Sequence, residues 1–86
     1  MTYFVYMILT KINNRYFSYV GYTNNLKKRI YQHNNSKGAK YTKGKMWQII
    51  YYKKYYSKNE AMKNEFKLKK DRIKRNLIKF KFINSL

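Results

Sequence analysis

The sequence predicts an α+β domain in which a small, three-stranded, largely antiparallel sheet is flanked by about three helices. Two neighbouring segments, residues 3–10 and 16–22, are aromatic and β-branched and are separated by a short polar link, which is typical of a β-hairpin. A third such segment, residues 47–56, lies between segments with apolar residues at helical spacing. The predicted order is β-β-α-β-α-α, and 86 residues leave no room for a second core. Residues 1–86 are therefore expected to form one domain.

The first helix should follow directly after the second strand. Thr23 or Asn24 is expected to cap it, because either side chain can accept a hydrogen bond from a free N–H of the first turn. Leu26 and Ile30 lie four residues apart and form its apolar stripe. The helix should end near residues 34–36.

The second half of the chain predicts a loop, a strand and two helices. Residues 37–45 hold two of the three glycines and four lysines, and we expect a loop there. After the third strand, Ser57 and Glu60 form a capping-box pattern that begins a helix running to about Lys70. Residues 72–82 repeat apolar side chains at helical spacing and predict the last helix.

The charge of the chain indicates a polyanionic partner. There are 21 lysine and arginine residues against 3 acidic ones, a net charge of +18. Self-repulsion at this level is relieved by binding a polyanion, so nucleic acid is the leading candidate and an anionic membrane surface the second. AT-rich codon usage is a plainer source of lysine, but it does not remove nearly every acidic residue.

Several classes of protein are disfavoured by absences in the sequence. There are no cysteines, which excludes disulfides, a thiolate zinc site and a cysteine nucleophile. No apolar run approaches the roughly 20 residues of a membrane span, and the first ten residues lack the pattern of a signal peptide. We expect a cytoplasmic protein that does not enter the membrane.

Five short motifs follow one another along the chain. They are Phe4-Val5-Tyr6, Tyr19-Val20-Gly21, the run from Gly21 to Arg29, the run from His33 to Thr42, and the run from Glu60 to Glu65. Each motif alone is weak, but all five in this order resemble the GIY-YIG nuclease superfamily. The similarity is to its small stand-alone, single-domain branch, related to structure-specific nucleases, and it covers about Tyr3 to Leu77. One departure is Phe4, which stands where the first motif is named for glycine.

The resemblance implies a GIY-YIG-like fold and a set of active-site residues. These are Tyr6, Tyr19, Arg29, His33 and Glu65. Tyr19 would be the general base that takes a proton from water, and Arg29 would bind the scissile phosphate through its planar fork. Glu65 would bind one Mg²⁺ or Mn²⁺ ion, which keeps several waters and is shared with substrate phosphate.

The residues themselves agree with these roles. A free tyrosine has a pKa of about 10 and needs help to act as a base at neutral pH. Arg29 and His33 project from the helix after Tyr19, and His33 could hydrogen-bond Tyr19 or shuttle its proton. The chain has 17 lysines and 4 arginines, so an arginine at position 29 suggests a need for a planar, bidentate group. The plainer alternatives are that Tyr6 and Tyr19 are core residues with hydrated hydroxyls, and that Arg29 is a solvated helix residue.

The remaining titratable residues also have plainer interpretations. A lone helix histidine such as His33 is more often an ordinary surface residue. Glu65 can form a surface ion pair with a neighbouring lysine such as Lys69, which would contribute little stability. Glu60 is explained by helix capping, and Asp71 by local pairing.

Nucleic-acid contacts are expected from the first helix and the basic loop. The candidates are Lys28, Lys37, Lys40, Tyr41, Lys43 and Lys45. Such a loop can track a phosphate backbone and stack a base on its aromatic residue, and the alternative is a solvated run of charge. Tyr22 stands where some family members carry a catalytic lysine, so its role is open. Asn76 is a doubtful counterpart of a late asparagine found in some relatives.

These observations predict a metal-dependent endonuclease that hydrolyses phosphodiester bonds in DNA and selects shape rather than sequence. The resemblance implies 5′-phosphate and 3′-hydroxyl ends. The alternative is a non-catalytic basic module that binds DNA or RNA, and a further alternative is a ribosome-associated interaction protein. A targeting partner and dimerisation both stay open.

Overall fold

A computed structural model describes all residues from 1 to 86. The chain begins with a hairpin of β1 (Tyr3–Ile12) and β2 (Arg15–Thr23). Asn13 and Asn14 join the strands with φ values of 51° and 66°, as a two-residue type I′ turn requires. Asparagine tolerates this left-handed conformation better than most residues, so the short link closes the hairpin without glycine.

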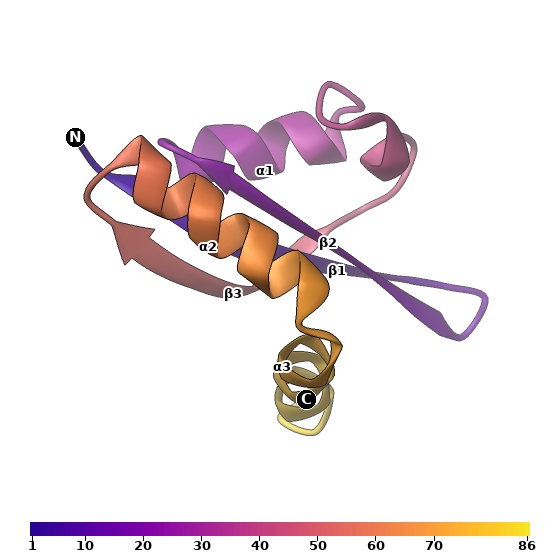
Figure 1. Cartoon of the computed structure of the whole chain (residues 1–86). Coiled ribbons are helices and arrows are strands. Elements are labelled where there is room, and N and C mark those ends of the chain that lie inside the picture. The colour runs from indigo at the N-terminus through magenta and orange to yellow at the C-terminus, as the bar shows by residue number, and fades with distance from the viewer.

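The third strand completes the predicted sheet. β3 (Gln48–Tyr55) pairs with the free edge of β1, so the strand order is β2-β1-β3 and both pairings are antiparallel. A register irregularity interrupts the β1–β3 pairing between Met7 and Ile8. The predicted α+β class and element order are confirmed (Figure 1).

The helix that follows β2 is α1 (Leu26–Asn34). The prediction that Thr23 or Asn24 caps it is wrong, because Asn25 is the N-cap and its Oδ1 accepts from Lys28 N–H at 3.1 Å. Thr23 instead accepts from the Asn25 N–H at 3.1 Å. The side chain of Thr23 therefore fixes the turn that leads into the helix.

Two further helices follow β3, and each begins at a capping residue. Ser57 caps α2 (Lys58–Lys70) by accepting from the Glu60 N–H at 3.1 Å, as its capping-box pattern predicts. Asp71 caps α3 (Arg72–Ile83) and accepts from the Lys74 N–H at 3.0 Å. No helix of the structure has both the length and the apolar character to cross a bilayer.

The sheet is covered on both faces, which buries residues 5–10 of the central strand β1. Val5 and Met7 on β1 pack with Ala61 and Leu68 of α2. Tyr6 and Ile8 point the other way and pack with Trp47, against partly buried side chains that include Leu26 and Ile30 of α1. Successive residues of a strand point to opposite faces, so β1 serves both core clusters. Figure 1 shows α1 on one side of the sheet and α2 on the other.

The last helix packs loosely. None of its residues is buried, and Ile73 and Leu77 of its predicted apolar stripe are exposed. Ile78 is half-buried and packs against the core cluster of α2. The helix therefore contributes little to the core.

Candidate active site

Tyr6 and His33 form a buried pair between the sheet and α1. Tyr6 is 1% exposed and His33 is 0% exposed. The Tyr6 hydroxyl lies 2.7 Å from His33 Nε2, and Arg29 Nε donates to the same hydroxyl oxygen at 3.4 Å. Arg29 and His33 are four residues apart on one helix and therefore face the same way. The helix thus brings both side chains to the first tyrosine of the motif set.

Glycines make room for both members of this pair. Gly21 is paired with Tyr6 across the β1–β2 ladder, and a Cβ at position 21 would lie 2.5 Å from the Tyr6 hydroxyl oxygen. A Cβ on Gly38 would overlap His33 Nδ1. The glycine of the second motif is therefore needed for clearance rather than for a special backbone conformation.

Thr42 determines which nitrogen of His33 carries the proton. The Thr42 hydroxyl donates to the carbonyl of Ala39 at 2.8 Å, and its oxygen lies 2.8 Å from His33 Nδ1. Because its only proton is used, Thr42 can act only as an acceptor toward His33, so Nδ1 carries the ring proton. Nε2 is then an acceptor and takes the proton of the Tyr6 hydroxyl. The hydrogen bonds run in one direction, from Arg29 through Tyr6, His33 and Thr42 to Ala39.

Burial sets the charge state of this network. It lowers the pKa of His33 to about 4, with the nearby Arg29 guanidinium acting in the same direction. It also raises the pKa of Tyr6 to about 12; the charges of Tyr19 and Glu65 add to this increase, while Arg29 opposes it. At neutral pH His33 is uncharged and Tyr6 keeps its proton. His33 is therefore not a cation beside Tyr19, and its expected hydrogen bond goes to Tyr6 instead.

Tyr19 has an open hydroxyl beside the buried pair. Its ring packs edge-on against His33, with centroids 5.3 Å apart, and stacks on Tyr41 at 6.1 Å. Its hydroxyl makes no hydrogen bond to the protein. It is also not buried, because Arg75 Nε is the one buried side-chain polar atom that lacks a hydrogen-bond partner. The hydroxyl of Tyr19 is thus available to a water molecule or to substrate.

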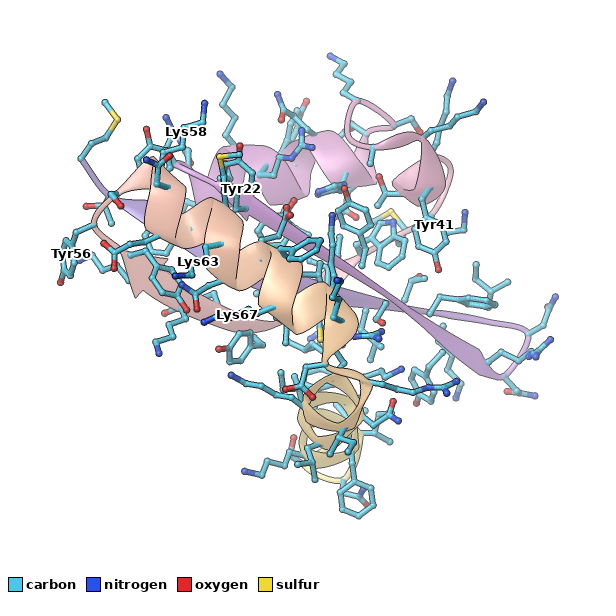
Figure 2. The ribbon with its side chains drawn as sticks, viewed as in Figure 1. Tyr22, Tyr41, Tyr56, Lys58, Lys63 and Lys67 are labelled. Carbon is cyan, nitrogen blue, oxygen red and sulfur yellow. The ribbon has the colours of Figure 1, made fainter.

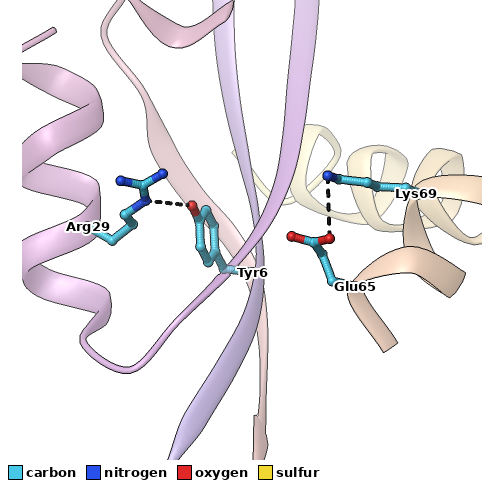
Figure 3. A network of polar contacts seen from close by, with 4 residues as sticks. All are labelled: Tyr6, Arg29, Glu65 and Lys69. Carbon is cyan, nitrogen blue, oxygen red and sulfur yellow. Dashed lines mark hydrogen bonds and ion pairs between the residues drawn. The ribbon is translucent and has the colours of Figure 1, made fainter. Parts of the chain in front are cut away.

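Glu65 reaches the same region from α2. Its side chain is 18% exposed and forms an ion pair with Lys69 at 3.4 Å, so the plainer expectation for Glu65 is also met. Lys69 Nζ lies 6.0 Å from the ring centroid of Tyr19, which connects the ion pair to the second motif. Figure 3 shows Arg29 and Glu65 on opposite sides of Tyr6. The five predicted site residues therefore gather around the edge strand β2, between α1 and α2.

The donor groups restrict what metal site is possible. No group of three or more histidine, cysteine or acidic side chains is present, so Glu65 would offer an ion a single carboxylate. Glu65 is a partly buried carboxylate that already attracts one cation, the Lys69 ammonium group. Mg²⁺ commonly uses one or two carboxylates together with waters and substrate phosphates. Glu65 therefore fits an ion that is also bound by a phosphate group of the ligand.

A basic pocket lies beside Arg29. It has a volume of about 390 Å³ and is lined by residues from both strands of the hairpin, the α1 N-terminus and the start of α2, including Tyr22, Lys28, Arg29 and Lys58. Figure 2 shows Tyr22 and Lys58 together near the first turn of α2. Arg29 Nη1 donates to Gln32 at 3.2 Å, which steadies the guanidinium at the pocket wall. Asn76 lies elsewhere, exposed on α3.

The predicted basic loop is tied to the site at two points. It contains a short 3₁₀ helix, Lys40–Thr42, whose Thr42 is fully buried against His33. Tyr41 stacks on Tyr19, and Lys45 Nζ donates to the Tyr41 carbonyl at 3.0 Å. The other lysines predicted to bind nucleic acid, Lys37, Lys40 and Lys43, are exposed. The loop is therefore more than a solvated run of charge.

Sequence reasoning missed four residues of this site. These are Gly21 and Gly38 in their space-making role, Thr42, and Lys69 as the neighbour of Tyr19. Thr42 lies inside the fourth motif, so the motif itself was a signal. The spacing from Glu65 predicted Lys69 as an ion-pair partner, but nothing in the sequence placed it beside Tyr19.

Comparison with known protein families identifies the family of this domain. Residues 2–78 match the model of the GIY-YIG catalytic domain. The chain belongs to the GIY-YIG family. That family is one of nuclease domains, so the match confirms the resemblance drawn from the five motifs.

Several curated relatives carry the name UPF0213 protein. One from Oceanobacillus iheyensis is 48% identical over 52 residues, 59% of this chain and 60% of its own length. One from Staphylococcus haemolyticus is 42% identical over 67 residues, 77% of this chain and 78% of its own. For the relatives from Oceanobacillus iheyensis and Clostridium perfringens, the match spans less than two thirds of the relative's own length, 60% and 57%. A solution NMR structure of a UPF0213 protein from Bacillus halodurans is 36% identical, with a TM-score of 0.48, and the match covers 94% of this chain and 86% of that one.

Proposed function

We propose that this GIY-YIG protein is an endonuclease that hydrolyses phosphodiester bonds in nucleic acid, with DNA favoured over RNA. The observation that carries the proposal is the gathering of Tyr6, Tyr19, Arg29, His33 and Glu65 at one edge of the sheet. Simple binding of nucleic acid needs positive charge and aromatic surface. It does not need a buried histidine with a defined tautomer or a carboxylate among cations.

Arg29 has the position and shape to bind the scissile phosphate. It borders the 390 Å³ pocket, and its Nε and Nη1 groups are already oriented by Tyr6 and Gln32. A planar guanidinium held in this way contacts a phosphate in a defined geometry and stabilises the charge that develops during phosphoryl transfer.

Tyr19 is the best candidate for the general base. Its hydroxyl is free of protein partners, whereas that of Tyr6 is used on both sides. To take a proton from the attacking water, Tyr19 must act as a phenolate, and Lys69 lies 6.0 Å from its ring to offset that charge. Tyr6 and His33 then act by position, because they hold Arg29 and support the ring of Tyr19.

Glu65 would hold the metal ion that the family implies, together with a substrate phosphate. A bound Mg²⁺ or Mn²⁺ would supply charge stabilisation at the phosphate and the leaving oxygen. Lys69 is the group that must move aside, since it pairs with the same carboxylate.

The test uses a matched pair of glutamates on α2. Purified protein is incubated with nicked, branched and linear DNA in Mg²⁺ or Mn²⁺, and products are sized and end-labelled. Glu65→Gln should abolish cleavage and keep DNA binding, whereas Glu60→Gln, which alters the exposed glutamate of the capping box, should keep both. Products should carry 5′-phosphate and 3′-hydroxyl ends. Equal activity in the two variants would remove Glu65 from the mechanism.

A non-catalytic nucleic-acid-binding module is the second candidate, and the Glu65–Lys69 ion pair favours it. A carboxylate satisfied by lysine has no need of metal, and the net charge of +18 is enough for binding. Tight binding without cleavage of any of these substrates, in either metal, would support the module and refute the nuclease.

A further inference from the structure

A second basic pocket opens beside Tyr19, away from the pocket of Arg29. It has a volume of about 260 Å³. Its lining comes from β2, the basic loop, α2 and α3, and consists of Ser18, Tyr19, Val20, Tyr41, Lys69 and Arg75. Two cations and two stacked aromatic rings therefore meet at one concave surface.

Arg75 has no partner within the protein. Its Nε is buried and makes no hydrogen bond, and no carboxylate pairs with its guanidinium. Burying a charged donor without an acceptor is unfavourable, and such groups are normally satisfied in folded proteins. An anion that enters the pocket would supply the missing charge and acceptors for the guanidinium.

The residue type at position 75 points the same way. Lysine outnumbers arginine by 17 to 4 in this chain, and α3 itself carries Lys74, Lys79 and Lys81. Because no carboxylate pairs with Arg75, an ion pair within the protein does not explain why this residue is arginine. Its planar fork suits a ligand with several oxygens, such as a phosphate group.

We propose that Arg75 and Lys69 bind a backbone phosphate of the nucleic-acid strand, next to the phosphate that Arg29 holds. Tyr41 is 47% exposed and stacks on Tyr19, so its outer face offers a platform for the neighbouring base. This inference rests on the proposed nucleic-acid substrate. It adds a second phosphate site on α2 and α3 that the five family motifs do not include.

The two sites lie on opposite sides of the tyrosines. In Figure 3, Arg29 is on one side of Tyr6 and Lys69 on the other. Figure 2 shows Tyr22, which lines the first pocket, and Tyr41, which lines the second, at separate ends of the region between α1 and α2. A strand held at both pockets would place the bond between them beside the open hydroxyl of Tyr19.

The experiment measures DNA binding in EDTA, where no cleavage occurs. Arg75→Gln is compared with Arg72→Gln, which removes the same charge from an exposed position of the same helix. Loss of one phosphate contact should reduce the slope of log K against log salt by about 0.7 for single strands or 0.9 for duplex. We expect this change, with a several-fold weaker affinity, in Arg75→Gln only. Arg75→Lys should restore part of the affinity, and thermal melting checks that every variant is folded.

A scan with methylphosphonates locates the contact. Each backbone phosphate in turn is replaced by a neutral methylphosphonate, which should weaken wild-type binding at a position flanking the cleavage site. Arg75→Gln should be insensitive to replacement at that one position. If Arg75→Gln and Arg72→Gln share one affinity and one salt slope, the second phosphate site is refuted. Binding with the expected Arg75 effect but no cleavage in metal refutes the nuclease function alone.

Discussion

Replacing Thr42 with valine tests the directed hydrogen-bond network at its inner end. Valine keeps the shape of threonine and replaces the hydroxyl with a methyl group, so the fully buried Nδ1–H of His33 loses its acceptor. The Ala39 carbonyl loses the hydroxyl donor but still accepts from the backbone N–H of residue 42. A buried polar group left without a partner costs about 1–3 kcal/mol. For a domain of this size, each kcal/mol lowers the melting temperature by roughly 4–8 °C. Thr42→Val should therefore melt at least about 4 °C below wild type.

A change of tautomer does not avoid this cost. If His33 moves its proton to Nε2, that nitrogen donates to the Tyr6 hydroxyl, which already accepts from Arg29. The proton of Tyr6 then has no acceptor, and the unsatisfied group has only moved along the network. Thr42→Ser is the matched control, because it keeps the hydroxyl and removes one methyl group.

Two measurements decide the question. Thermal melting gives the stability difference, and long-range ¹H–¹⁵N NMR correlations show which ring nitrogen of His33 is protonated. We expect Nδ1–H in wild type and in Thr42→Ser, and a clear loss of stability in Thr42→Val whichever ring nitrogen carries the proton. The reasoning is wrong if Thr42→Val melts together with Thr42→Ser.

Three further outcomes follow from the same geometry. His33 has a pKa of about 4 in the folded protein against about 6.5 when unfolded, so the unfolded chain binds more protons between these values. Stability should fall by up to about 3 kcal/mol as pH drops from 6.5 to 4, and urea titrations of His33→Gln should lack this part of the pH dependence. Tyr6→Phe should lose both stability, by about 1–3 kcal/mol, and cleavage, whereas Tyr19→Phe should lose cleavage with its melting temperature nearly unchanged; equal melting of the two would contradict the assignment. Gly21→Ala should cost about 1–3 kcal/mol in urea unfolding because its Cβ meets the Tyr6 hydroxyl, and an unaltered midpoint would show that the strand relaxes freely.

The fold could be predicted from the sequence because the patterns that specify its strands, turns and helix caps are local. The aromatic and β-branched run of β1, the asparagine turn and the Ser57 capping box all depend on neighbours within a few residues. The predicted N-cap of α1, Thr23 or Asn24, was wrong. Several adjacent side chains can accept a hydrogen bond from the first turn of the helix, and only the path of the turn selects Asn25. Local chemistry thus predicted the elements and left one boundary undecided.

Some features of the candidate site could likewise be predicted from the sequence, and others depended on the tertiary structure. The sequence alone determined the family motifs, the strong positive charge, and the importance of Tyr6, Tyr19, Arg29, His33 and Glu65 as candidates. Only the tertiary structure decided that His33 bonds to Tyr6 and not Tyr19, that Thr42 orients it, and that Arg75 is left without a partner. The reason is physical: Tyr6 and His33 are 27 residues apart in the chain. Which polar groups pair after burial depends on how the strands and helices pack, and the spacing of residues along the sequence does not specify that packing.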